Sequence, residues 1–132
     1  MDRVAELHRY LKSCGARRYE PGQFDCALFA AGWVDLIRDT NLVETWQGTY
    51  CSLQQGHRTI RKAGHSSLRK FVDDTVGPGK GWAFAQPGDV ALMPRKLGAL
   101  GLVGTGGHVH VLQDIEGLDV VSLEQAWSVH RP

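Results

Sequence analysis

The sequence has little cysteine, no long apolar run and almost no excess of either charge. Its three cysteines, Cys14, Cys26 and Cys51, are an odd number without C-x-x-C spacing, which argues against a disulfide framework and against a structural zinc site. No segment is apolar over the length that crosses a membrane, and the first residues lack the apolar core of a signal peptide. The sequence therefore predicts a protein without membrane insertion that is made in a reducing compartment.

The charge balance also excludes one class of partner. The 15 Lys and Arg residues nearly cancel the 14 Asp and Glu residues, so bulk charge does not indicate a nucleic-acid binder. A short basic cluster on predicted helices is typical of a solvated face; it consists of Arg58, Arg61, Lys62, Arg69 and Lys70. The length of 132 residues and the apolar fraction of 42% predict a single domain over residues 1–132.

Apolar residues at helical spacing predict four helices in the first half of the chain. Asp25 and Ser52 are residue types that cap a helix start, and Gly15 and Gly64 are typical helix stops. We expect these helices over residues 2–13, 25–39 and 52–63 and from Ser66 or Ser67 onward, with an irregular segment over 40–50.

The second half of the chain has a different pattern. A cluster of helix breakers, Gly77 to Gly81, is followed by short apolar runs that predict strands separated by Gly-rich turns. We expect strands at Asp89–Met93, Ala99–Val103, His108–Leu112 and Leu118–Val121, and one helical turn within 122–127. The predicted fold class is α+β, with N-terminal helices packed on a small antiparallel sheet.

Cys26 is the first candidate for chemistry. It follows Asp25 at the start of an apolar helix, where unpaired N–H groups and the helix dipole favour a thiolate. Cysteine hydrolases use such a thiolate as their nucleophile. The alternative is a small buried cysteine with a purely structural role.

A cysteine hydrolase also needs a base and a group that orients it. His108 and His110 lie two apart on a predicted strand and therefore on one face, so one is a candidate base and the other its partner. Alternatively, both face solvent while Val109 and Val111 face the core. A zinc ion on the His-x-His pair is not favoured, because no third ligand is near, and we expect no metal or cofactor. No role is assigned to the other histidines, His8, His57, His65 and His130.

The order of these features resembles the NlpC-type cell-wall peptidases, a compact papain-like family. The matching segments are Phe24–Phe29, for the Asp-Cys nucleophile helix, and Pro87–Leu92, for the Gly-Asp strand. A closer likeness, to small NlpC-like proteins of phage and gene-transfer-agent tails, covers nearly the whole chain. It adds Gly48-Thr49-Tyr50 and a late Ala126-Trp127.

The resemblance implies a tail-tip or baseplate protein of a virion, made in the cytoplasm of the bacterial host, with other tail proteins as partners. It also implies a peptidase or amidase in which Cys26 attacks peptide cross-links of peptidoglycan and His108 or His110 moves the proton. One position departs from the family: Ala99 stands where the catalytic histidine is expected. The alternative is therefore an inactive structural hub or adaptor with the same fold.

Overall fold

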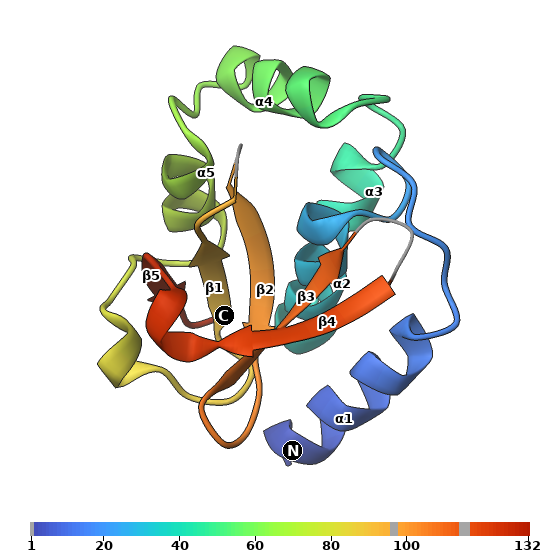
Figure 1. Cartoon of the computed structure of the whole chain (residues 1–132). Helices are drawn as coiled ribbons and strands as arrows, with labels where there is room; N and C mark the ends of the chain where they lie inside the picture. Colours follow the sequence, from blue (N-terminus) through green and yellow to red (C-terminus); the bar gives the residue numbers. More distant parts are fainter. Residues whose placement is uncertain (1, 96–97, 114–116) are drawn as a thin grey trace.

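The structure is a computed structural model that describes residues 2–95, 98–113 and 117–132. It is an α+β fold in which five helices precede a sheet, as Figure 1 shows. The helices are α1 (Arg3–Cys14), α2 (Cys26–Arg38), α3 (Leu42–Trp46), α4 (Leu53–Lys62) and α5 (Leu68–Thr75). Two short 3-10 helices, η1 (Trp82–Phe84) and η2 (Leu123–Gln125), lie beside the sheet.

The sheet has five antiparallel strands in the order β4-β3-β2-β1-β5. Their bounds are β1 (Val90–Met93), β2 (Ala99–Val103), β3 (His108–Gln113), β4 (Gly117–Ser122) and β5 (Ser128–His130). Side chains of successive residues point to opposite faces, so each inner strand contributes to two apolar layers.

The larger apolar layer lies between the sheet and α2, which runs behind the strands in Figure 1. Phe29 and Trp33 of α2 are fully buried there, against Leu100 and Leu102 of β2. The indole N–H of Trp33 also donates a 2.8 Å hydrogen bond to the carbonyl of Gly88. These contacts fix α2 relative to the first two strands.

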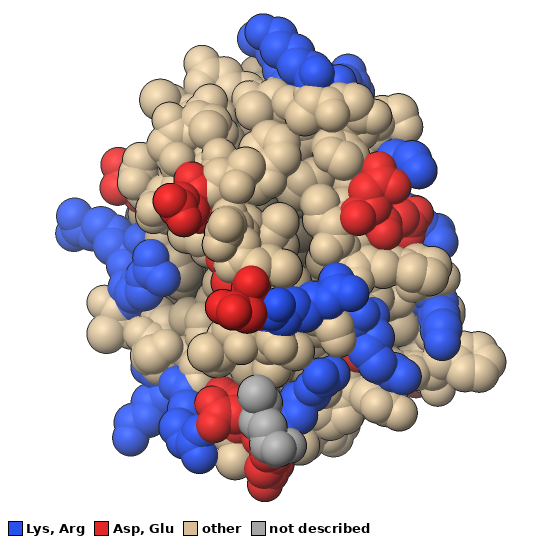
Figure 2. All heavy atoms as spheres, turned by 180° about the vertical axis from the view of Figure 1, so that it is seen from behind, with Lys and Arg blue, Asp and Glu red and all other residues tan. Residues whose placement is uncertain are grey.

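The other face of the sheet carries a smaller apolar cluster that includes Ala99, Val109 and Val111, and Cys26 packs against it. The face seen in Figure 2 carries acidic and basic side chains among uncharged ones. Among the described residues, every helix is too short or too polar to cross a bilayer.

The structure confirms the α+β class, the predicted helix caps at Asp25 and Ser52, and the four predicted strands to within about a residue. The prediction of an irregular segment over 40–50 is wrong, because it contains α3. The carboxylate of Asp35, on the preceding helix, accepts hydrogen bonds from the backbone N–H groups of Leu42 and Val43 and so caps α3. Strand β5 was not predicted either.

Candidate functional site

The start of α2 is organised by the buried carboxylate of Asp25. One of its oxygens accepts a 3.0 Å hydrogen bond from the backbone N–H of Leu28, as an N-cap does. The other accepts from the backbone N–H of Gly22 at 2.9 Å and from the hydroxyl of Tyr50 at 2.5 Å. Burial and the neighbouring Asp25 raise the pKa of Tyr50, so its hydroxyl stays protonated and donates. Two segments noted separately in the sequence, the Asp-Cys pair and Gly48-Thr49-Tyr50, are therefore one hydrogen-bonded unit.

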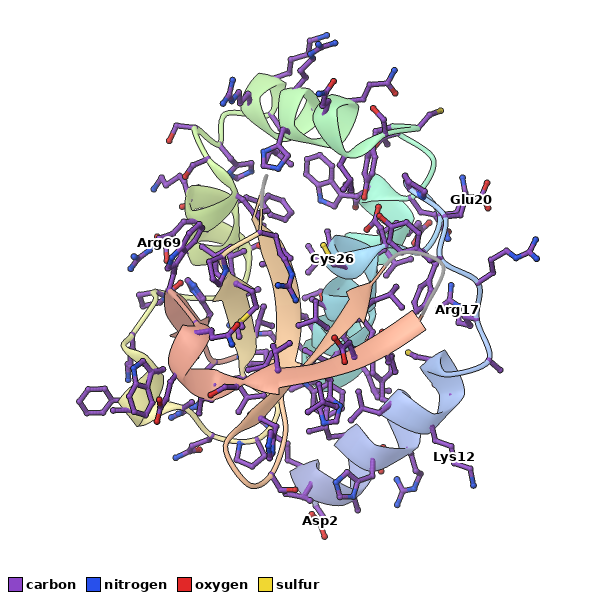
Figure 3. All side chains as sticks on the ribbon, in the orientation of Figure 1. Asp2, Lys12, Arg17, Glu20, Cys26 and Arg69 are labelled. Carbon is purple, nitrogen blue, oxygen red and sulfur yellow. The ribbon has the colours of Figure 1, made fainter. Side chains whose placement is uncertain are left out.

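Cys26 is the first residue of α2, and its side chain lies toward the space below α4 in Figure 3. Burial raises the pKa of the Cys26 thiol to about 11. A backbone hydrogen bond from Leu100 lowers the pKa and the charge of Asp25 raises it, but both effects are smaller than that of burial. The sequence predicts a thiolate at this helix start; in the structure, burial outweighs the helix start and the group is a thiol at neutral pH.

A pocket of about 650 Å³, part of it open to solvent, lies beside Cys26. Its walls come from the start of α2, from α4 and from α5, and most of the side chains are apolar or aromatic. The lining residues other than Asp25 and Cys26 include Ala31, Trp46, Tyr50, Leu53, His57, Ile60, Leu68 and Phe71. Such a pocket suits an apolar group better than a charged one.

Ala99 lies close to Cys26. It is the first residue of β2, it belongs to the cluster against which Cys26 packs, and it precedes Leu100, whose backbone is hydrogen-bonded to the thiol. Ala99 is itself buried, and its methyl side chain offers no proton acceptor. The NlpC-type resemblance expects the catalytic histidine at this position.

His108 and His110 share one face of β3, as predicted, but neither lines the pocket beside Cys26. His110 pairs with Leu102 of β2, and its imidazole packs against Gly104, where an added Cβ would lie 2.6 Å from Nε2. Gly104 lies four positions after Leu100, which is roughly 13 Å along a strand. His108 lies beyond, in an exposed position. Burial, with smaller contributions from the charges of His8 and His108, lowers the pKa of His110.

The histidine that shares the pocket with Cys26 is His57, to which the sequence analysis assigned no role. It lies on α4 between Leu53 and Ile60, and these three residues line the pocket together. Their spacing places them on one helix face. The spacing is visible in the sequence, but only the structure shows that this face of α4 lines the pocket beside Cys26.

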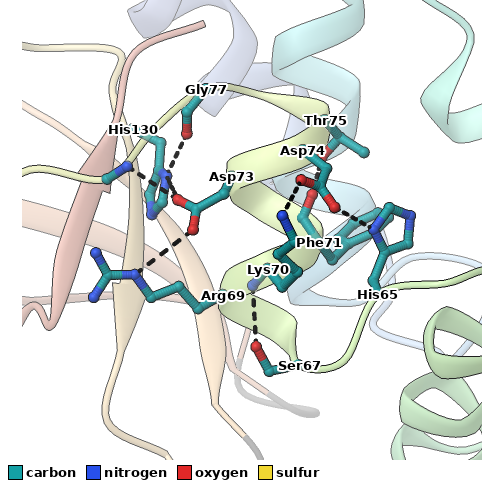
Figure 4. Close-up of polar contacts among 11 residues, drawn as sticks. His65, Ser67, Arg69, Lys70, Phe71, Asp73, Asp74, Thr75, Gly77 and His130 are labelled. Atoms are coloured by element: carbon teal, nitrogen blue, oxygen red, sulfur yellow. Dashed lines mark hydrogen bonds and ion pairs between the residues drawn. The ribbon is translucent and has the colours of Figure 1, made fainter.

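A second group of polar side chains is buried on the far side of α5, where Figure 4 shows part of it. Nδ1 of His130 lies 2.7 Å from the carbonyl oxygen of Gly77 and 3.4 Å from a carboxylate oxygen of Asp73. Its Nε2 lies 2.8 Å from Oγ of Ser128. A carbonyl only accepts, so Nδ1 carries a proton, and Nε2 is hydrogen-bonded to the Ser128 hydroxyl. Ser128 and His130 are both fully buried, so the group ties β5 to the end of α5 without offering a site to a substrate.

Comparison with known proteins identifies the family. The model of the family described as "Domain of unknown function (DUF6950)" matches residues 2–131, and the chain therefore belongs to this family. None of the curated protein sequences compared with the chain matches it. Among the described residues, no group of three or more His, Cys, Asp or Glu side chains is placed to hold a metal ion.

Proposed function

We propose that this protein is a non-catalytic component of a phage tail tip or baseplate, with an NlpC-like fold whose former cysteine site has become a binding pocket. The observation that carries the non-catalytic part is the surroundings of the Cys26 sulfur. The sulfur lies beside an apolar pocket, and the pKa of the thiol is raised to about 11. Ala99 belongs to the cluster against which Cys26 packs, and it stands where the resemblance expects the catalytic base.

The chemistry of a cysteine hydrolase explains why these surroundings matter. The thiolate is the nucleophile, and a base within hydrogen-bond reach normally forms it. With a pKa near 11, only about one thiol in ten thousand is ionised at pH 7. His110 cannot take the proton, because its imidazole packs against Gly104 at the other end of β2.

The tail assignment rests on the resemblance of the sequence to small NlpC-like tail proteins. It is supported by the order of the elements, with a Cys-bearing helix before an antiparallel sheet. It is also supported by the hydrogen bond between Tyr50 and Asp25, which gives both motif segments a common structural role.

The presence of His57 in the pocket favours a second candidate function, the hydrolysis of peptide cross-links in peptidoglycan. In this version α4 moves inward, His57 takes the thiol proton, and Cys26 attacks the amide carbonyl. Backbone N–H groups at the start of α2 then stabilise the oxyanion, and His57 returns the proton to the amine as the C–N bond breaks. Water, deprotonated by His57, then hydrolyses the thioester on Cys26, which releases the acid and restores the thiol.

Purified peptidoglycan separates the two functions. We expect no soluble peptide to be released by the wild-type protein, by Cys26→Ala or by His57→Ala. Release by the wild-type protein that both substitutions abolish would establish the hydrolase instead.

The tail assignment has its own test. Purified particles of the phage that carries the gene should contain the protein at the tail tip when they are labelled with a specific antibody. A phage with Cys26→Ala should form plaques at the wild-type frequency, because the sulfur performs no reaction. Particles that lack the protein would contradict the assignment.

A further inference from the structure

Helix α4 presents one face to the pocket, and the described residues cover only part of that face: Ile60 is buried and the ring of Tyr50 packs against Gly56. Leu53, Gly56, His57 and Ile60 recur at helical spacing and all line the pocket. Of the whole helix, only Ile60 is buried, and Leu53 remains 39% exposed. An amphipathic helix normally buries its apolar stripe against the core, so this stripe is available to an incoming group.

The rest of α4 carries positive charge without compensation. Arg58, Arg61 and Lys62 are exposed, α4 contains no acidic residue, and none of the three forms an ion pair with any residue in the described part of the chain. The neighbouring α5 differs, because its basic residues Arg69 and Lys70 each pair with an aspartate. In Figure 2 the edge of the molecule that carries α4 shows basic and no acidic side chains.

We propose that α4 and the pocket beneath it bind an acidic segment of a partner protein, with one large apolar side chain of that segment inserted beside Cys26. This inference rests on the proposed function in one respect only, namely that the site binds a partner instead of cleaving a substrate. Helix α4 contributes to both features: one face lines the apolar pocket for the anchor, and its other faces carry the three cations for the flanking carboxylates.

The physical roles of the two features differ. Insertion of a Leu or aromatic side chain removes apolar surface from water and supplies most of the affinity, as anchor residues do at protein interfaces. The exposed cations add less affinity but select the partner and speed its association, and salt screens them. The acidic Asp25 in the pocket does not repel the segment strongly, because its carboxylate is already hydrogen-bonded to Gly22, Leu28 and Tyr50.

The test uses a short fluorescein-labelled peptide of Asp and Glu residues with one central Leu, measured by fluorescence anisotropy on the full chain. We expect binding that weakens about tenfold when the central Leu is replaced by Ala and that is lost when the acidic residues are replaced by Lys. Added salt should weaken the binding further.

Matched variants locate the binding. The triple variant Arg58→Glu, Arg61→Glu and Lys62→Glu should weaken it about tenfold or more. A control triple variant has the same change in net charge at exposed positions away from α4. It carries Lys12→Glu, Arg18→Glu and Lys80→Glu, and it should bind the peptide as the wild type does. Filling the pocket with Ala31→Leu should also weaken binding, whereas Ala63→Leu, at an exposed position, should not.

Three results would overturn the proposal. They are equal affinity for the Leu and Ala peptides, equal effects of the two triple variants, and binding of anionic vesicles or of a second copy of the chain in place of the peptide. The binding measurements are repeated with Cys26→Ala, which lacks the candidate nucleophile. If Cys26→Ala binds the peptide and the wild-type chain hydrolyses cell walls, the non-catalytic function is refuted but the docking surface on α4 is supported.

Discussion

The hydroxyl of Tyr50 donates a 2.5 Å hydrogen bond to the buried carboxylate of Asp25, and this bond joins the segment before α4 to the start of α2. Asp25 also receives hydrogen bonds from Gly22 and Leu28, so one carboxylate holds a loop, a helix start and a distant tyrosine. Gly22 must be glycine here: its φ is +83°, and an added Cβ would lie 1.8 Å from the carbonyl oxygen of Tyr50. The position of Cys26 and one wall of its pocket therefore depend on this unit.

Removing the tyrosine hydroxyl should destabilise the fold measurably. Tyr50→Phe leaves the buried Asp25 carboxylate with one donor fewer, and we expect the free energy of unfolding in urea to fall by about 2 kcal/mol. Tyr10→Phe is the matched control, because the Tyr10 hydroxyl donates to the neutral carbonyl of Phe29 and its loss should cost about 1 kcal/mol. A loss for Tyr50→Phe no larger than that of the control would contradict the central role of Asp25.

Introducing a base at position 99 should change the reactivity of the thiol. In Ala99→His the imidazole enters next to Cys26, and we expect alkylation of Cys26 by iodoacetamide at pH 7 to accelerate about tenfold or more. Ala99→Phe adds similar bulk without a base, and both variants should lose about 1–3 kcal/mol of stability from overpacking. Equal alkylation rates in the two variants would show that position 99 does not face the sulfur.

The buried group around His130 predicts a stability effect far from the pocket. His130→Phe leaves the Gly77 carbonyl without its donor, and we expect a loss of about 3 kcal/mol. Ser128→Ala removes only the hydroxyl that is hydrogen-bonded to Nε2 and should cost about 1 kcal/mol. His108→Ala, at an exposed position, should stay within about 0.5 kcal/mol of the wild type in the same urea titrations. A small effect of His130→Phe would mean that the group contributes no stability.

The raised pKa of Cys26 also predicts how stability depends on pH. The thiol ionises near its ordinary value of 9.0 in the unfolded chain and near 11 in the folded one. Its contribution to stability is therefore complete below about pH 9 and is lost as the pH rises toward 11. The difference in urea midpoint between the wild type and Cys26→Ala should change over this interval and stay constant below it. If the difference in urea midpoint changed only below pH 9, the raised pKa of Cys26 would be contradicted.

The helices and inner strands could be predicted because their determinants are local. Asp25 and Ser52 cap helices through neighbours three residues away, and apolar spacing marks the buried faces. Helix α3 was not predicted because the residue that caps it, Asp35, belongs to another helix. Strand β5 was not predicted because it has only three residues, and these form a strand only by pairing with β1.

The candidate site could be predicted only in part, for a similar reason. A helix start with a cysteine is visible in the sequence, and so is the alanine where the resemblance expects a base. Which histidine lies near the sulfur depends on strand register and on the position of α4, neither of which is a local property. The sequence therefore makes His110 a candidate and gives His57 no role, although the structure places His57 in the pocket and His110 near Gly104.

The central claim is that Cys26 carries a half-buried, unactivated thiol. The most direct measurement is an NMR titration of isotope-labelled cysteine in a chain that carries Cys14→Ala and Cys51→Ser, so that Cys26 gives the single signal. We predict a midpoint near pH 11, unchanged by His57→Ala. A midpoint below neutral pH that rises in His57→Ala would contradict the account and identify a thiolate–imidazolium pair.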